Sequence, residues 1–460
     1  MENISDEERN VCLYCGEKAV STCGKCGVAF YCGRNHQEKH WPKHKLQCFP
    51  FIIKHTESSG RYLVSSRDLP AGSLILKEAP FVLGPKATSS LICLSCHIPL
   101  ISNNFVKCTK CQWPMCSQRC AEQSQHQEEC KILSLDEKKC GVPFQHGETP
   151  RYDLILILRC LLLKTNPEYW EILQNLESHW NQRREDAEPH HTAAVRYFTE
   201  VCKIGFEDDV IHQVRGAIIT NAINTKSPSG VTLRGLYSKI SLLNHSCFPN
   251  ISLRSDKNHV LFIRTTVNVK KGEPLYFSYV PTTDPVWCRQ NDLKEIYYFT
   301  CNCIRCSSQS EMNTYYSSLL CGECSKGLFT FHQNISIWKC NHCSKEVKLK
   351  EIMKQSNDLI QWVNNKKISP KHVKLFLKNV AEKCPKFNFL YFETLQLILA
   401  FLKDNNSIES NDTKKEVWED IIKILSIVEP GVTRRRDREL IKNILSSGQS
   451  NKDPEIFFDW

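Results

Sequence analysis

The chain has 460 residues, of which 41% are hydrophobic and 24% charged, with a formal net charge of +10. This length predicts about two to four domains, and the composition excludes a disordered or collagen-like chain. The acidic start MENISDEERN and a longest apolar run of LILILRCLLL, which contains Arg159, indicate neither a secretory signal nor a membrane span.

The 26 cysteines are the most informative feature of the composition. Without a secretory signal, thiols at this density predict metal ligands and not disulfides. We therefore expect a reducing location, the cytoplasm and the nucleus.

Residues 12–48 carry the first metal-binding pattern. Two C-x2-C pairs can each present thiolates to one ion, and cysteine or histidine then recurs every fourth residue in YCGRNHQEKHWPKHKLQC. Pro42 predicts two short helices here, and His40 is left over. The alternative is a group of surface histidines beside an unrelated thiol cluster. We predict two zinc sites, formed by Cys12, Cys15, Cys32 and His36 and by Cys23, Cys26, His44 and Cys48.

The next segment predicts β structure and then a repeat of the first pattern. Within RYLVSSRDLPAGSLILKEAP, two strand-like runs flank a turn at Pro70, Ala71 and Gly72. Residues 91–133 repeat the finger pattern with a cysteine in place of His36, which makes that histidine the weaker ligand of its set. The repeat predicts two more zinc sites, formed by Cys93, Cys96, Cys116 and Cys120 and by Cys108, Cys111, His126 and Cys130.

Helical periodicity dominates two stretches of the chain. Residues 150–225 include YDLILILRCLLLKTNPEYWEILQNLESHW, and EVWEDIIKILSIVE represents the amphipathic pattern beyond residue 350. The basic run TRRRDREL (433–440) matches either a nuclear signal or a solvated helical face, and we favour the latter.

Cys247, in SLLNHSCFPN, allows three interpretations: a buried thiol, a nucleophile, or a ligand of a site assembled from elsewhere. Downstream, CNCIRC supplies only three thiolates, whereas structural zinc normally takes four ligands. We therefore assign Cys247 as the fourth. A separate C-x2-C-x15-C-x2-C pattern predicts a zinc ribbon. The two sites are Cys247, Cys301, Cys303 and Cys306, and Cys321, Cys324, Cys340 and Cys343.

Metal loading changes the charge argument. Twenty-one thiolates contribute −21 and six zinc ions +12, so the formal charge falls from +10 to about +1. Nucleic acid binding is therefore not expected, and we also expect no membrane partner and a monomer. The remaining thiols are predicted to be small buried hydrophobes: Cys140, Cys160, Cys202, Cys288 and Cys384.

Four motifs in order carry a family resemblance. The pattern ending in HWPKHKLQC resembles a MYND zinc finger, and GLYSKISLLNHSCFPN, GEPLYFSYV and YYFTCNCIRC resemble a split SET domain. Together they resemble the SET and MYND domain (SMYD) protein-lysine methyltransferases, and the second cluster with the ribbon resembles their arthropod-type branch.

The resemblance implies an α+β fold with a β-rich SET domain. Its NHSC strand and the segment of Tyr279 are expected to meet in a knot-like crossing. The expected order is 1–50 N-terminal MYND finger, 51–90 first SET part, 91–133 second MYND-like cluster, 134–225 helical SET insert, 226–290 SET core, 291–310 post-SET zinc segment, 311–350 four-cysteine zinc ribbon, and 351–460 a shortened α-helical C-terminal lobe.

The resemblance also implies roles for individual residues. Tyr279 corresponds to the catalytic tyrosine, and Tyr297 to the aromatic residue that lines the lysine channel. Asn244, His245 and Phe299 correspond to positions that bind S-adenosylmethionine. Weaker matches to cofactor-binding positions are Asn221 and Arg61.

One departure from the family pattern concerns the cofactor turn. Where such proteins usually have glycine, any residue, glycine, this chain has GRYL with Tyr62 at the second glycine. A tyrosine does not allow the same close backbone approach. We therefore keep two functions: a lysine methyltransferase acting on a histone or non-histone protein, with structural zinc, and a catalytically weak or inactive adaptor or transcriptional co-regulator whose fingers bind proline-containing peptides. DNA binding through the first finger is a third possible function, which the low net charge of the zinc-loaded protein disfavours.

Overall fold

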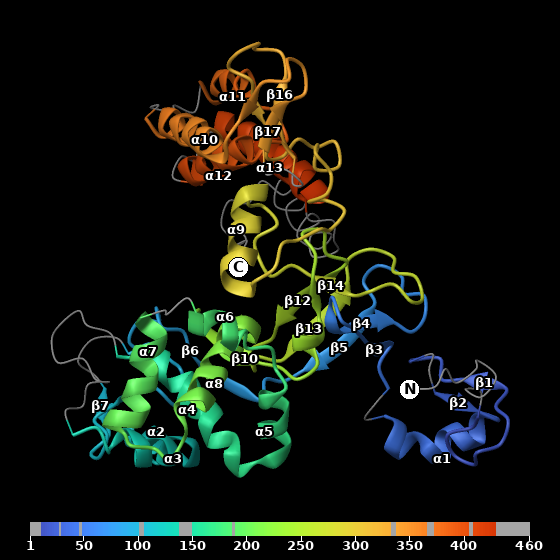
Figure 1. Ribbon diagram of the computed structural model, residues 1–460, viewed down its shortest axis with the longest axis vertical. Coiled ribbons are helices and arrows are strands. Elements are labelled where there is room, and N and C mark those ends of the chain that lie inside the picture. Colours follow the sequence, from blue (N-terminus) through green and yellow to red (C-terminus); the bar gives the residue numbers. More distant parts are fainter. Residues whose placement is uncertain are drawn as a thin grey trace.

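The computed structural model describes residues 11–26, 29–45, 48–100, 105–137, 150–185, 189–332, 337–365, 372–403 and 408–428. Figure 1 shows short sheets at the centre, a small N-terminal finger to one side, a group of helices around β6 and β10, and a helical lobe beyond α9. This arrangement confirms the predicted α+β class with a helical C-terminal region. Cys140 and the basic run 433–440 lie outside the described residues.

The first finger contains two short strands and one helix: β1 (Ser21–Thr22), β2 (Phe30–Tyr31) and α1 (Arg34–His44). Helix α1 is continuous with Pro42 inside it, so the prediction of two short helices is wrong. Pro42 removes one backbone donor, but the final turn is anchored by His44, whose Nε2 lies 3.6 Å from Cys26 Sγ. His40, left over in the sequence, has Nδ1 3.0 Å from the hydroxyl oxygen of buried Tyr31.

Three antiparallel sheets form the centre. They have the orders β3-β4, β12-β13-β5 and β6-β10-β9. The strands are β3 (Phe51–Thr56), β4 (Gly60–Ser65), β5 (Leu74–Glu78), β6 (Val82–Pro85), β9 (Ile223–Lys226), β10 (Thr232–Leu236), β12 (Ile251–Ser255) and β13 (Leu261–Thr265). The predicted strand, turn and strand are therefore confirmed as β4 and β5, with Gly72 at φ 86° in the turn.

The unusual Tyr62 lies within strand β4, opposite Lys54 of β3. The left-handed residue of this hairpin is Gly60, at φ 60°, and not Tyr62. An extended strand accepts any side chain, so Tyr62 fits this backbone without strain.

The NHSC segment and the Tyr279 segment meet as predicted. Strand β11 (Asn244–His245) pairs in parallel with β14 (Tyr276–Phe277), with His245 opposite Phe277. Parallel neighbours need a crossover connection, and here it contains β12 and β13.

The second thiol-rich segment is packed against the helical insert. Its elements are β7 (Val106–Lys107), β8 (Pro114–Met115), α2 (Gln118–Ala121) and α3 (Ser124–Leu133). The insert is helical as predicted and contains α4 (Asp153–Leu162), α5 (Pro167–Gln174), α6 (Trp180–Glu185), α7 (Pro189–Arg196) and α8 (Asp208–Asn221). A short 3-10 turn (Leu163–Thr165) follows α4, and a π-helical turn (Tyr197–Val201) follows α7.

Helix α4 is the centre of this core. Residues 154–161 are all buried, including Arg159 at 6% exposure. Arg159 Nε lies 2.6 Å from Oε1 of buried Glu129 on α3, and its Nη2 donates to the carbonyl of Leu94 at 2.8 Å. Burial opposes ionisation of Glu129, but the charge of Arg159 beside it lowers its pKa. The second finger is thus joined to the insert by a buried ion pair.

The C-terminal part begins with α9 (Val286–Tyr297) and the four-stranded ribbon sheet β15-β16-β17-β18. Its strands are β15 (Leu319–Leu320), β16 (Leu328–His332), β17 (Ile337–Cys340) and β18 (Glu346–Val347). The lobe then contains α10 (Leu349–Asn364), α11 (Val373–Ala381), α12 (Phe389–Lys403) and α13 (Ile408–Val428). None of the described helices has the length and apolar character needed to cross a membrane.

Six groups of metal-ligand side chains converge in the described residues. In five of the predicted sets, the four ligand atoms lie within 4.8 Å of one another. In the ribbon, Cys321 Sγ lies 3.7 Å from Cys343 Sγ, and Cys324 Sγ 3.8 Å from Cys340 Sγ. These thiol and imidazole sets are the ligands of structural zinc. His36, the weaker ligand by sequence, has Nδ1 3.7 Å from Cys12 Sγ and belongs to its set.

The metal content is the first test of this architecture. Native mass spectrometry of the purified chain is expected to find close to six zinc ions, since six four-ligand sets are formed. A count of four or fewer would contradict the assignment of the His36 set or of the ribbon.

The buried ion pair gives a second prediction. Arg159→Met should leave the Glu129 carboxylate buried without its cation and lower the free energy of unfolding by about 3–5 kcal/mol. Urea denaturation measures this change. Lys131→Met is the matched control, because the Lys131–Glu128 pair on the same helix is exposed and such pairs contribute about 0–1 kcal/mol. Equal losses in the two variants would contradict the prediction.

Candidate active site

The candidate site is built around Tyr279, just after the β11–β14 crossing. The Tyr279 hydroxyl donates to the backbone carbonyl of Leu243 at 2.7 Å, which turns the ring back toward β11. Burial, with a smaller contribution from Tyr297, raises the pKa of Tyr279 above its ordinary value. The phenol therefore stays protonated at neutral pH, and its single proton is engaged by the Leu243 carbonyl.

The two residues of β11 contact different parts of the site. The Asn244 side-chain Nδ2 donates to the carbonyl of Ser59 at 3.0 Å, at the turn that precedes β4. His245 accepts a hydrogen bond on Nδ1 from the backbone N–H of Tyr279 at 3.0 Å. The imidazole thus supports the backbone that carries the tyrosine.

Two aromatic residues reach the site from the end of helix α9. Tyr298 caps this helix in a left-handed conformation, at φ 58°, and so redirects the chain after Tyr297. The Tyr297 ring centroid lies 4.8 Å from that of Tyr279, and the Phe299 centroid lies 5.8 Å from that of His245. The structure therefore brings together Tyr279, Tyr297, His245 and Phe299, as the resemblance implied.

The Cys247 cluster lies directly beside these aromatic residues. Cys247 Sγ lies 3.5 Å from Cys306 Sγ and 4.0 Å from Cys301 Sγ, and Cys303 completes the set. Cys247 is 0% exposed, which leaves no access for a substrate, so the geometry favours a metal ligand over a nucleophile. Hydrogen bonds from the three other thiols lower the pKa of Cys247, and one from His245 acts in the same direction.

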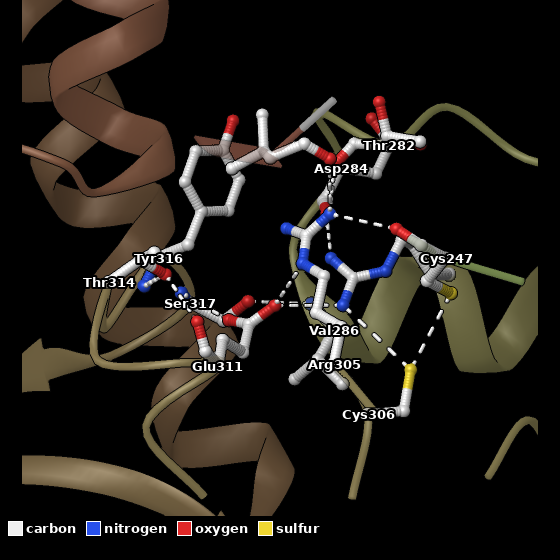
Figure 2. A network of polar contacts seen from close by, with 12 residues as sticks. Cys247, Thr282, Asp284, Val286, Arg305, Cys306, Glu311, Thr314, Tyr316 and Ser317 are labelled. Carbon is white, nitrogen blue, oxygen red and sulfur yellow. Dashed lines mark hydrogen bonds and ion pairs between the residues drawn. The ribbon is translucent and has the colours of Figure 1, made fainter. Parts of the chain in front are cut away.

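A buried network of polar contacts that includes Arg305 and Glu311 lies beside Cys247 and Cys306, as Figure 2 shows. Glu311 Oε1 lies 2.8 Å from Nη2 of Arg289 and 3.1 Å from Nε of Arg305, and both arginines are almost fully buried. Arg305 also donates to the carbonyl of Thr282 at 2.6 Å. Burial opposes ionisation of Glu311, but the charges of Arg289 and Arg305 lower its pKa and keep it ionised.

Arg61 and Asn221 have other contacts. The Arg61 guanidinium donates to the carbonyl of Asn175, and Asn221 Nδ2 donates to the carbonyls of Glu177 and Ala217, both at 2.8 Å. Among the described contacts, Arg61 joins β4 to the insert, Asn221 bonds only within the insert, and neither side chain reaches Tyr279 or Phe299. Their role in cofactor binding stays a prediction.

Several residues of the site were not found by sequence reasoning. Gln290 on α9 donates to the carbonyl of Cys301 at 2.8 Å and accepts from its N–H at 3.0 Å, which fixes the thiol-rich loop to the helix. The acceptor carbonyl of Leu243 leaves no trace in a sequence, because every residue has one. The position of Arg305 within CNCIRC was a usable signal, since a charged residue between buried metal ligands needs a counter-ion, which here is Glu311.

Two family models match this chain. Residues 12–48 match the MYND finger model, and residues 60–280 match the SET domain model. The second match runs from β4 to just past Tyr279 and includes the second thiol-rich segment, the helical insert and Cys247, whereas Tyr297, Phe299 and the three later thiols of the site lie beyond its end.

Several curated proteins are similar to this chain. The SET domain-containing protein SmydA-8, isoform A, of Drosophila melanogaster is 25% identical over 349 residues, covering 73% of this chain and 74% of that protein. The histone-lysine N-methyltransferase SMYD3 of Homo sapiens is 25% identical over 276 residues, covering 56% and 61%. A solved structure of Rubisco LSMT bound to AdoMet aligns over 89% of this chain and 91% of that chain at 11% identity with a TM-score of 0.31. With its MYND finger, its SET domain and these relatives, the chain belongs to the SET and MYND domain family.

Proposed function

We propose that the protein is an S-adenosylmethionine-dependent protein-lysine N-methyltransferase that acts on a histone or non-histone protein. The observation that supports this best is the protonated Tyr279, whose hydroxyl proton is donated to the Leu243 carbonyl. The lone pairs of its oxygen stay available to accept a hydrogen bond from an incoming amine.

The reaction requires a neutral lysine amine. Since the ordinary pKa of lysine is ~10.4, deprotonation at physiological pH costs about 4 kcal/mol. Burial beside aromatic rings lowers the pKa of an amine, and Tyr297 and Tyr279 provide such surroundings. Orientation by the Tyr279 oxygen then supplies the alignment that an in-line displacement needs.

The residues beside Tyr279 suit the cofactor. S-adenosylmethionine, when bound, supplies an electrophilic methyl group on a sulfonium cation. The rings of Phe299 and His245 offer faces to an adenine or a cation, and Asn244 offers an amide for the polar amino-acid end. These three side chains would hold the cofactor against the tyrosine.

A second function is favoured by the surface of the first finger. Leu13, Tyr14 and Val20 are exposed to 52%, 48% and 79%, although they lie in a small metal-bound module. Such exposed apolar residues suit docking of a proline-containing peptide. This adaptor function does not require cofactor binding, so a calorimetric titration in which the protein takes up no S-adenosylmethionine would favour it over methyl transfer.

The tyrosine provides the direct test of catalysis. Tyr279→Phe should abolish methyl transfer, measured with radiolabelled S-adenosylmethionine, because the oxygen that orients the amine is lost. The free energy of unfolding should change by only about 0.5–1.5 kcal/mol, the value of one hydrogen bond. Wild-type turnover in this variant would exclude the catalytic assignment.

The Cys247 cluster gives a further prediction that joins metal and cofactor. Cys247→Ser should lower the zinc count by one and weaken S-adenosylmethionine binding in calorimetry, because β11 and the Phe299 segment lose their common anchor.

Cys160→Ser is the control for this substitution. Cys160 is equally buried but lies outside the six sets, so its replacement should cost about 1–3 kcal/mol of stability and leave the zinc count unchanged. An unchanged zinc count in Cys247→Ser would contradict the ligand assignment, and lost turnover with zinc and cofactor retained would indicate a nucleophile.

A further inference from the structure

His245 has a different hydrogen-bond partner at each ring nitrogen. Its Nδ1 lies 3.0 Å from the backbone nitrogen of Tyr279, and its Nε2 lies 3.2 Å from Cys247 Sγ. The imidazole therefore lies between the residue proposed to orient the amine and a ligand of the zinc cluster.

The first of these contacts determines the tautomer. A backbone N–H can only donate, so Nδ1 must present a lone pair to Tyr279. In the neutral ring, the proton then resides on Nε2. This N–H points at Cys247, whose sulfur is a thiolate when it binds zinc and is then an effective hydrogen-bond acceptor. Both contacts are satisfied at once by the Nε2–H tautomer.

We propose that His245 is a positioning residue that transmits the state of the Cys247 zinc cluster to Tyr279. The zinc-bound thiolate holds the Nε2–H, which keeps Nδ1 free to accept from the Tyr279 backbone and so places the phenol ring. This inference rests on the proposed function for its catalytic meaning, but the hydrogen-bonded link itself does not.

A purely packing role is the alternative. The His245 ring lies 5.2 Å from the Tyr279 ring and 5.8 Å from the Phe299 ring, centroid to centroid. If only these contacts mattered, every smaller polar replacement would act through stability alone. The two nitrogens allow the roles to be separated, because each can be replaced individually.

Two variants each keep one of the two hydrogen bonds of His245 and remove the other. His245→Asn places an amide oxygen near the position of Nδ1, which keeps an acceptor for Tyr279 and removes the donor to Cys247. His245→Gln reaches the position of Nε2 with an amide N–H, which keeps the donor to Cys247 and removes the acceptor for Tyr279. Full-length, zinc-loaded protein is used for both, and thermal unfolding compares their stability.

The expected results run in opposite directions. The Asn variant should release the zinc of the Cys247 cluster to a chromogenic chelator about tenfold faster than the Gln variant. The Gln variant should have a kcat about tenfold below that of the Asn variant. Each tenfold difference corresponds to the loss of one hydrogen bond. The kinetic phase of zinc release that belongs to this cluster is identified by its absence in Cys247→Ser. If the same variant were the more impaired one in both zinc release and kcat, the proposal would be overturned in favour of a packing role.

The ring itself provides a measurement that does not depend on activity. In ¹⁵N-histidine-labelled wild-type protein, the His245 signals, assigned by their loss in the Gln variant, should show a protonated Nε2 and an unprotonated Nδ1. A protonated Nδ1 would overturn the proposal. If the wild-type protein transfers no methyl group, the proposed function fails, whereas zinc release and the tautomer still test the link from Cys247 to His245.

Discussion

The convergence of four thiols at Cys247 is the constraint on which the candidate site depends. Cys247 closely follows the β11 residues Asn244 and His245 in the sequence. Its three partner cysteines come more than fifty residues later, after the end of helix α9. One ion at this point therefore joins both groups of residues that we propose to hold the cofactor. Structural zinc contributes about 10–16 kcal/mol in small fingers, which is comparable to the whole stability of a domain, about 5–15 kcal/mol.

The buried charges around the cluster follow from the same constraint. Four thiolates and one zinc ion carry about −2, a charge that would be costly to bury alone. Arg289 and Arg305 with Glu311 add a net charge of +1 beside it. Arg289 Nη2 lies 3.9 Å from Cys306 Sγ, so one guanidinium faces the metal ligands directly. Figure 2 shows how this network continues from Arg305 and Glu311 to Tyr316 and Ser317, toward the C-terminal lobe.

The two repeated fingers have become different parts of the molecule. The first has a small core of its own and contacts the sheets through polar pairs such as Arg67 Nη1 and the carbonyl of Gly24, 2.8 Å apart. The second shares an extensive hydrophobic core with the helical insert, and Glu129 and Arg159 join the two. Similar ligand spacing therefore supports a peripheral module in one place and part of the scaffold in the other.

The sequence by itself determined the metal-ligand sets and the aromatic residues of the site. Ligand spacing is local, because two thiols of a tight turn or of one helical face must meet a single ion, and the incomplete CNCIRC pattern required a fourth ligand such as Cys247. The tertiary structure alone decided how the chain continues through Pro42, where anchoring of His44 outweighs a lost hydrogen bond. It also decided that Arg61 contacts the insert, that Asn221 bonds within it, that Gln290 holds Cys301, and that His245 lies between Cys247 and Tyr279. These contacts depend on how separate elements pack and on backbone groups that every residue possesses, and no spacing along the chain records either.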